Sequence, residues 1–327
     1  MKRPIKAGKL YSGGFSLNVL SDDELYEIHL ATLEVLKTVG VFVESDEARE
    51  IFGSNGACID EKTKVVTFDP YIVEDAIRTT PDTFHAYGRI PESDVALEAN
   101  RVTFTNFGEG IMFVDPYTGK RRETTKADIE MAARVIDSLD HVETYERCML
   151  SHDKHHSVQA LHNAEASLTN TTKHHWLGPV DRYQCGKIIE VCCAIAGGHE
   201  KFRERPFLTF VTCPISPLKL STHHCEIIIE AANNGMGVNC IGMAMAGGSS
   251  PIHIAGTLVQ QNAEVLSSLV LSQMVRKGAS FVYGSSTCPL DLRHATASVG
   301  SPETGMINAA VSRLARYYSL PVFAAGG

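Results

Sequence analysis

The sequence has little of what would place the protein on a nucleic acid, in a membrane or outside the cell. Basic residues are in deficit, with 30 Lys and Arg against 38 Asp and Glu and a net charge of −8. This balance argues against a dedicated binder of nucleic acid or of an anionic membrane. The first residues carry no long apolar segment, so we expect no signal peptide. Residues 231–263 are uncharged, but Gly, Asn, Ser and Pro interrupt them too often for a membrane helix.

The common sequence signatures of catalysis are also missing. No Gly-x-Gly-x-x-Gly turn follows the first strand, and no Gly-x-Ser-x-Gly nucleophile elbow is present. His152 and His156 have the spacing of a helical zinc pair, but no motif places a third ligand, so we expect no metal site. Residues 246–255 could bind a phosphate at a helix N-terminus, yet they lack the lysine of a P-loop. The nine cysteines have no regular spacing and indicate reduced thiols in a cytoplasmic protein.

The first hundred residues predict a mixed α and β region. Residues 1–18 are rich in Lys and Gly and are expected to form an arm. Ser21 and Glu24 have the spacing of a capping box, which begins a helix that Gly40 ends. Short strands and helices are expected between residues 41 and 98. Residues 102–107 and 111–114 flank Gly108-Glu109-Gly110 and are expected to pair as a hairpin. We therefore predict an N-terminal α+β domain over residues 1–100 and a second domain over residues 101–327.

The second domain alternates strands and helices. Strands are expected over 142–148, 174–177, 206–213, 237–243, 280–283 and 322–325, with a helix after each except the last. The helix after the third strand, for example, is expected over 222–233, where Asn234-Gly235 ends it. Alternation of this kind implies a parallel sheet, and the near absence of charge in the strands fits burial on both faces. We favour an incomplete (β/α)₈ TIM barrel of about six βα units over an open doubly wound sheet. A complete barrel has eight βα units, so we expect the last two units to be missing from this chain.

The carboxyl ends of the predicted strands are rich in Gly, Pro, Ser and Met, and charge is scarce there. In a barrel the active site lies at these ends. The composition predicts a broad, apolar site whose floor is backbone. Because no acid–base pair or nucleophile stands out, the sequence leaves two possibilities, a binding scaffold or an enzyme whose key group lies beyond Gly327.

Several stretches at these strand ends resemble the trimethylamine:corrinoid methyltransferase family. They include Thr105-Asn106-Phe107-Gly108-Glu109-Gly110, Cys213-Pro214-Ile215-Ser216-Pro217-Leu218, Met243-Ala244-Met245-Ala246-Gly247-Gly248-Ser249-Ser250-Pro251, Tyr283-Gly284-Ser285-Ser286 and Gly300-Ser301-Pro302-Glu303. The resemblance covers about residues 15–327. It implies a (β/α)₈ barrel that is longer than this chain.

The resemblance also implies a mechanism. One branch of the family carries pyrrolysine, encoded by an amber codon, and that position maps directly after Gly327. We therefore expect a form truncated at the amber codon, from an enzyme that transfers methyl from trimethylamine to Co(I) of a separate corrinoid protein. The corrinoid would be carried by the partner, and this chain would bind no cofactor itself. A cytoplasmic homo-oligomer is expected.

The candidate site residues follow from the strand ends. Beside the expected pyrrolysine, the carboxylates Glu109, Asp291 and Glu303 could balance a substrate cation or assist protonation. A methylammonium favours aromatic walls, and the candidates are Phe107, Trp176, Tyr283 and Phe323.

Two alternatives stay open. The first is the family's other branch, which lacks pyrrolysine and acts on quaternary amines such as glycine betaine. The second is a non-catalytic scaffold that binds the corrinoid protein.

Overall fold

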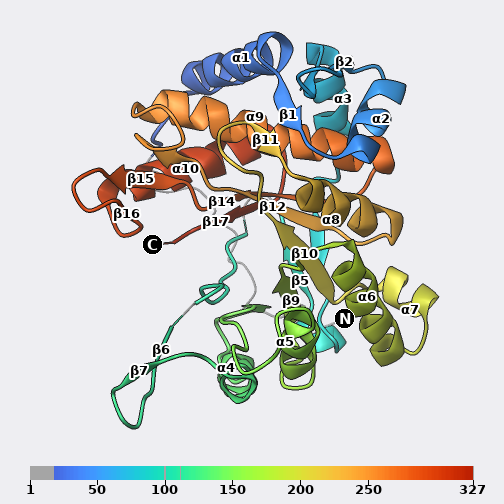
Figure 1. Cartoon of the computed structure of the whole chain (residues 1–327), viewed down its shortest axis with the longest axis vertical. Coiled ribbons are helices and arrows are strands. Elements are labelled where there is room, and N and C mark those ends of the chain that lie inside the picture. The colour runs from blue at the N-terminus through green and yellow to red at the C-terminus, as the bar shows by residue number, and fades with distance from the viewer. Residues whose placement is uncertain (1–17, 99–100, 111, 327) are drawn as a thin grey trace. The chain divides into compact units, whose positions relative to one another are not determined.

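The computed structural model describes residues 18–98, 101–110 and 112–326 (Figure 1). Its contacts divide the chain into two compact units. Unit 1 contains residues 85–211 and 234–236, and unit 2 contains residues 13–84, 212–233 and 237–327, apart from the positions outside the described ranges. Both units are discontinuous in sequence, whereas the predicted division was a single boundary near residue 100. That division stays a prediction, and the expected arm lies almost wholly outside the described residues.

The N-terminal part of unit 2 is a small mixed layer. Its elements are α1 (Asp22–Thr38), β1 (Val41–Val43), α2 (Asp46–Ser54), β2 (Cys58–Asp60), β3 (Val65–Thr67) and α3 (Pro70–Thr79). The predicted capping box is present, because the Ser21 side chain accepts from the backbone N–H of Glu24 and the Glu24 carboxylate accepts from that of Ser21. The strands pair in the order β11-β1-β3-β2, where β11 (Lys219–Leu220) comes from far along the chain.

The remainder of unit 2 continues the βα alternation. Its elements are α8 (Thr222–Asn233), β12 (Val238–Gly242), β13 (Met245–Ala246), α9 (Ile254–Val275), β14 (Phe281–Ser285), β15 (Cys288–Asp291), β16 (Thr296–Ala297), α10 (Pro302–Tyr317) and β17 (Val322–Ala324). Strands β12, β14 and β17 are parallel neighbours. The loops after β12 and β14 add the small sheet β13-β15-β16. Helix α9 is buried on nearly all sides and packs on α1, α3, α8 and β12, as an apolar central helix does (Figure 1).

Unit 1 contains the other half of the alternation. Its first elements are short: β4 (Phe84–Ala86), the 3₁₀-helix η1 (Pro91–Ser93), β5 (Val95–Leu97), β6 (Phe113–Val114) and β7 (Arg121–Arg122). Strand β4 begins at the boundary between the units. The βα alternation follows with α4 (Lys126–Asp137), β8 (Thr144–Glu146), α5 (Gln159–Leu168), β9 (His174–Leu177), α6 (Arg182–Ala196), α7 (His199–Glu204) and β10 (Leu208–Thr212). Strands β8, β9 and β10 are parallel neighbours. With the three strands of unit 2, they supply the six βα strands that the sequence predicts.

One local prediction in unit 1 is wrong. The alternating residues 102–107 suggested a strand paired with 111–114 across Gly108-Glu109-Gly110, but residues 101–109 form no strand. The hairpin lies instead one step later, where β6 and β7 pair around the turn at 115–120. Residues 105–110, which precede this hairpin, run beside β8 and contribute to the candidate site described below.

Candidate functional site

The carboxyl ends of β8 and β9 lie side by side in unit 1. The two strands are in parallel register, with Glu146 opposite Trp176. The N–H of Arg147 donates to the carbonyl of Trp176 at 3.1 Å, which continues the ladder one residue past β8. Glu146 and Arg147 therefore stand at the end of a barrel strand where catalytic groups are expected.

The segment 105–110 is bound along β8 by its own polar groups. The Asn106 side-chain amide donates to the carbonyl of Glu146 at 2.7 Å and accepts from the N–H of Glu146 at 2.9 Å. The N–H groups of Glu109 and Gly110 donate to the carbonyls of Arg147 and Cys148, both at 2.8 Å. The Asn106 side chain thus takes the place of a backbone strand partner. This arrangement fixes Glu109 next to the end of β8.

Arg147 joins this segment to the end of β9. Its guanidinium is buried, donates to the carbonyl of Gly178 at 2.7 Å and forms an ion pair with the Glu109 carboxylate. Glu109 has a φ of +59°, in the left-handed region that non-glycine residues seldom adopt. Such a conformation costs on the order of 1 kcal/mol and persists only where its surroundings impose it, often at functional sites.

Glu146 has the most unusual environment of the three charged residues. Its carboxyl packs against the backbone of Gly108, where an added methyl carbon would lie 2.4 Å from Oε1. A side chain at position 108 would therefore require the Glu146 side chain to move. Within the described part of the chain its oxygens accept no hydrogen bond. Burial, and then the negative charge of Glu109, raise the pKa of Glu146 to about 7, although Arg147 opposes the shift.

Sequence reasoning identified Glu109 but missed Glu146 and Arg147. The signal that could have found them is their charge, because a Glu-Arg pair interrupts a set of strands that is otherwise nearly free of charged residues. The predicted site was apolar, whereas the strand end in unit 1 carries two carboxylates and a guanidinium. A raised carboxyl pKa beside a like charge is typical of acid–base sites.

Among the predicted aromatic residues, Phe107 and Trp176 belong to unit 1. Phe107 lies in the same segment as Glu109 and is 79% exposed. Trp176 is 1% exposed and packs edge-on against His174, with ring centroids 4.8 Å apart. The structure therefore gives Trp176 a packing role and offers a ligand almost none of its surface. Its contact with a substrate stays a prediction.

Tyr283 and Phe323 lie on the paired strands β14 and β17 of unit 2. Tyr283 is fully buried, and its hydroxyl donates to Oδ1 of Asn262 at 2.7 Å. The Asn262 amide donates in turn to the Tyr318 hydroxyl at 2.8 Å, and that hydroxyl lies 3.2 Å from Nδ1 of His29. Tyr283 therefore anchors a buried polar chain. Phe323 is half-buried opposite Gly284, on the other face of the strands, because side chains alternate.

The two remaining predicted carboxylates also belong to unit 2. Asp291 ends β15 and accepts from the N–H of Arg293 at 2.8 Å, and its carboxylate lies 2.8 Å from Nδ1 of His294. The bond to His294 is the main cause that lowers the pKa of Asp291. Glu303 is exposed in the first turn of α10, where a negative charge complements the helix dipole. Both residues have local structural roles, and their part in catalysis stays a prediction.

A buried carboxylate that sequence reasoning did not single out anchors the loops after β10 and β12. Glu264 of α9 accepts from the Ser216 hydroxyl at 2.8 Å, the N–H of Leu218 at 3.0 Å and the Gln260 amide at 2.9 Å. Gln260 also donates to the carbonyl of Ser249. Burial raises the pKa of Glu264, and these hydrogen bonds oppose the shift. Its role is to hold two strand-end loops in place.

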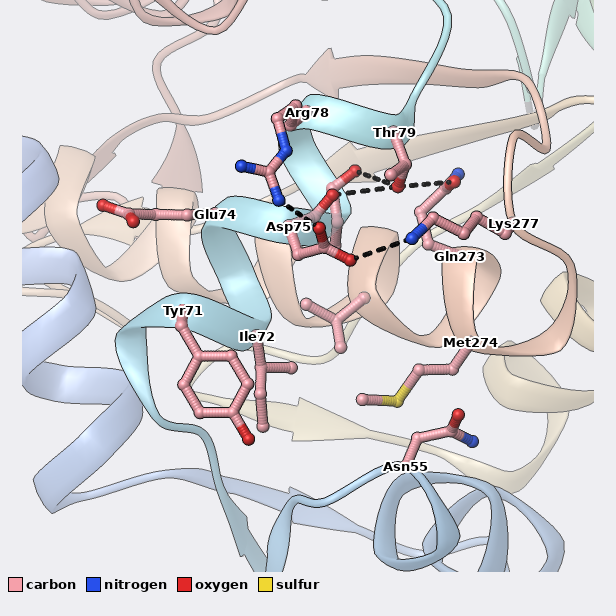
Figure 2. Close-up of a pocket in the computed structure, with 12 residues that line it drawn as sticks. Asn55, Tyr71, Ile72, Glu74, Asp75, Arg78, Thr79, Gln273, Met274 and Lys277 are labelled. Carbon is pink, nitrogen blue, oxygen red and sulfur yellow. Dashed lines mark hydrogen bonds and ion pairs between the residues drawn. The ribbon is translucent and has the colours of Figure 1, made fainter.

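A surface pocket of about 290 Å³ lies elsewhere in unit 2, between α3 and the C-terminal part of α9 (Figure 2). Its apolar floor includes Ile72 and Met274. At its rim Asp75 pairs with both Arg78 and Lys277, as the dashed lines in Figure 2 show. The pocket borders the end of α9 that leads into the start of β14, so it is remote from that strand's carboxyl end. Asp75, Arg78 and Lys277 are paired with one another, and Glu74 lies 3.7 Å from His29 outside the pocket. The pocket is therefore a poor candidate for the active site.

Other features add no further site. No group of three or more His, Cys, Asp or Glu side chains within residues 18–98, 101–110 and 112–326 could hold a metal ion. Over the same ranges no helix has the length and hydropathy needed to cross a membrane. Burial lowers the pKa of His174 and His224 to about 3 and that of His175 to about 4, so these are neutral core histidines.

Comparison with known proteins supplies the context for this site. The sequence profile of a family described as trimethylamine methyltransferase (MTTB) matches residues 6–327. Trimethylamine methyltransferase MttB of Desulfitobacterium hafniense is 46% identical over 327 residues, which is all of this chain and 66% of that protein. Glycine betaine methyltransferase of the same species is 29% identical over 311 residues, 95% of this chain and 64% of that protein. The chain thus spans just under two thirds of the length of these curated relatives.

The fold also has a counterpart among solved structures. The crystal structure of monomethylamine methyltransferase (MtmB) from Methanosarcina barkeri matches with a TM-score of 0.54. The match covers 92% of this chain and 67% of that one, at 14% sequence identity. This likeness concerns the fold alone. It confirms the predicted class, an incomplete (β/α)₈ barrel with a mixed N-terminal region.

Proposed function

Because the chain belongs to the trimethylamine methyltransferase family, we propose that the complete protein transfers a methyl group from trimethylamine to the Co(I) of a partner protein's corrinoid. The observation that carries this proposal is the 46% identity to a trimethylamine methyltransferase over the whole chain. Since the chain spans only part of its relatives, the activity, substrate and partner of the whole protein are inferred. The corrinoid would supply the nucleophile that accepts the methyl group.

The residues at the end of β8 support a cationic substrate. The buried guanidinium of Arg147 is already occupied by Glu109 and by the carbonyl of Gly178. Within the described ranges the second carboxylate, Glu146, forms no ion pair, although the charge of Arg147 opposes the rise of its pKa. We propose that Glu109 and Phe107 belong to the substrate site, and that Asp291, Glu303, Trp176, Tyr283 and Phe323 are secondary candidates. Positioning and exclusion of water would be the main contributions of the barrel.

Glycine betaine is the second candidate substrate, because a betaine methyltransferase is among the relatives at 29% identity. A betaine carries a carboxylate as well as a quaternary nitrogen. In unit 1 that carboxylate would meet two glutamates and an arginine that is already paired. Like charges disfavour one another in a buried site. The strand end therefore favours an amine without a carboxylate.

The assay for this function uses the full-length protein, a cognate corrinoid protein reduced to Co(I), and either trimethylamine or glycine betaine. Loss of the Co(I) absorbance should depend on trimethylamine. A response to glycine betaine alone would instead establish the betaine branch. Binding of the corrinoid protein without methyl transfer from either amine would favour the scaffold.

Several further properties stay proposals. We propose a cytoplasmic homo-oligomer that acts with a corrinoid protein, and each of the nine cysteines is a thiol in this structure. Pyrrolysine directly after Gly327 stays a prediction. The nucleotide sequence after the Gly327 codon tests it, since an amber codon within an open frame is required. A different stop codon with no frame beyond it would contradict the prediction.

A further inference from the structure

A chain of buried hydrogen bonds joins α1, α9, α10 and β14 inside unit 2. It runs from Tyr283 of β14 through Asn262 of α9 to Tyr318, which directly follows α10, and from there to His29 of α1. Nδ2 of Asn262 also lies 2.9 Å from the hydroxyl of Thr32 on α1. All five side chains are buried, so their polar atoms depend on one another for partners.

The directions of these bonds follow from one backbone carbonyl. The Thr32 hydroxyl has a single proton, which it donates to the carbonyl of Ile28 at 2.7 Å. Thr32 must therefore accept from the Asn262 amide, which fixes the orientation of that amide. The second N–H of the amide donates to the Tyr318 hydroxyl at 2.8 Å. Tyr318 thus accepts from Asn262 and keeps its own proton for another acceptor.

That acceptor is Nδ1 of His29, which lies 3.2 Å from the Tyr318 hydroxyl. A neutral imidazole has one N–H and one unprotonated nitrogen. Because Nδ1 accepts, the proton is on Nε2, which lies 3.7 Å from Oε1 of Glu74 on α3. The network therefore requires neutral His29 to be the Nε2–H tautomer.

Protonation of His29 disrupts this order. A proton from water adds to the lone pair of Nδ1, and this nitrogen becomes a donor. The Tyr318 hydroxyl then faces two donors, Asn262 and His29, and its own proton loses its acceptor. A buried hydroxyl without an acceptor is costly, so Tyr318 must move or give up its bond to Asn262.

The groups around His29 set the direction of the pH effect. Within the described residues, the titratable groups that face it are Glu74 and the rings of Tyr317 and Tyr318, whose centroids lie 5.8 and 5.5 Å from that of His29. Burial lowers the pKa of His29, and the exposed Glu74 only partly opposes this. The folded state thus favours neutral His29, whose stabilising effect is full above pH 6.5 and is lost as pH falls.

Tyr318 stands at the junction between α10 and β17. Two residues later the N–H of Leu320 donates to the carbonyl of Ala315 at 2.8 Å, and β17 then pairs with β14. We propose that His29 is a pH-sensitive switch, which when neutral holds Tyr318 and the α10–β17 junction against α9 and which releases this junction when protonated. This inference goes beyond the proposed function and does not rest on it.

The test is the pH dependence of one substitution in the full-length protein. Tyr318→Phe removes the hydroxyl and keeps the ring, and Tyr317→Phe, at a neighbouring position that is 43% exposed, is the matched control. In urea unfolding Tyr318→Phe should raise the unfolding equilibrium constant roughly fivefold at pH 8, as for loss of one buried hydrogen bond. This effect should shrink as the pH falls below 6.5. The control should show no such dependence.

A second background makes the result specific to His29. His29→Asn can offer an amide oxygen to Tyr318 in place of Nδ1, but it does not titrate. In this background the effect of Tyr318→Phe should be the same at each pH. Hydrogen exchange of residues 318–324, corrected for its intrinsic pH dependence, should quicken at low pH in the wild type and not in His29→Asn.

Nuclear magnetic resonance of ring-labelled histidines tests the tautomer in the wild type itself. The His29 signal, identified by its loss in His29→Asn or by its shift in Tyr318→Phe, should show the Nε2–H form at pH 8. An Nδ1–H form would overturn the proposal. So would an equal effect of Tyr318→Phe at pH 8 and at the lowest pH where the wild type stays folded. Neither result bears on the proposed function, because no methyl transfer is measured.

Discussion

Replacing Glu146 by glutamine should stabilise the protein at alkaline pH. In the folded state Glu146 holds its proton up to about pH 7, whereas an ordinary glutamate releases it near 4.5. Between these values the folded state binds more protons than the unfolded state, so stability falls as pH rises through this window. A shift of about 2.5 units corresponds to roughly 3 kcal/mol of lost stability above pH 7.

Glutamine removes this loss but places an amide in the same unpaired position. Burying an amide without partners costs about 1–3 kcal/mol by mutational measures, so we expect a net gain of about 1 kcal/mol at pH 8.5. At pH 5 folded wild-type Glu146 is mostly neutral, so the cost of the amide is hardly offset and the same substitution should destabilise the protein by about 1–2 kcal/mol. The change of sign between the two pH values is the signature of a buried carboxyl with a raised pKa.

The assay is urea unfolding of the full-length protein at pH 5 and pH 8.5, with hydrogen exchange of residues 144–148 as a local measure. Trp176, the single tryptophan of this chain, pairs with Glu146 across β8 and β9 and reports on the same region by fluorescence. The control is Glu123→Gln, a substitution at an exposed position of unit 1. An equal effect of Glu146→Gln at both pH values would refute the reasoning, since it would mean that Glu146 titrates alike in the folded and unfolded states.

Three other substitutions test the structural assignments. Glu264→Ala removes the acceptor of three hydrogen bonds and should lower the free energy of unfolding in urea by roughly 3 kcal/mol. Glu264→Gln should lower it less, and equal losses of stability in the two variants would contradict the anchoring role. Tyr318→Phe removes the hydroxyl that links α1 to α9 and should cost about 1 kcal/mol, whereas the control Tyr317→Phe, at a 43% exposed position, should cost little. His224 stays neutral when buried, with its pKa lowered to about 3. Its stabilising effect is therefore full above pH 6.5 and is lost as pH falls toward 3. His224→Gln should reduce the slope of the unfolding free energy against pH in this acid range by up to about 1.4 kcal/mol per pH unit. An unchanged slope would mean that His224 is protonated in the folded state.

The βα alternation could be read from the sequence because each element carried its own signals. The helix predicted over 222–233 and the strand over 174–177 have the bounds found for α8 and β9. Runs of apolar residues that end at Gly or Asn are local features, and they determined these limits. Short strands such as β11 and β13 were missed, because β11 forms only by pairing with β1, some 175 residues away.

The site was less predictable because it depends on contacts that no local pattern encodes. The alternating residues 102–107 looked like a strand, but the Asn106 side chain pairs with the backbone of Glu146, 40 residues away. That interaction replaces the expected hairpin and brings Glu109 to the end of β8. Neither the raised pKa of Glu146 nor the burial of Arg147 can be inferred before this pairing is known.

Gly108 shows why composition alone suggested a different site. The glycines at the strand ends predicted a site lined by exposed backbone, because glycine has no side chain to cover it. At Gly108 the missing side chain has another consequence, because the space is filled by the carboxyl of Glu146. Within the described residues Glu146 thus keeps a partly buried carboxyl that accepts no hydrogen bond, and its raised pKa lowers the stability of the protein above pH 7. A carboxyl with a raised pKa beside a second carboxylate at the end of a barrel strand has the environment that is typical of functional groups.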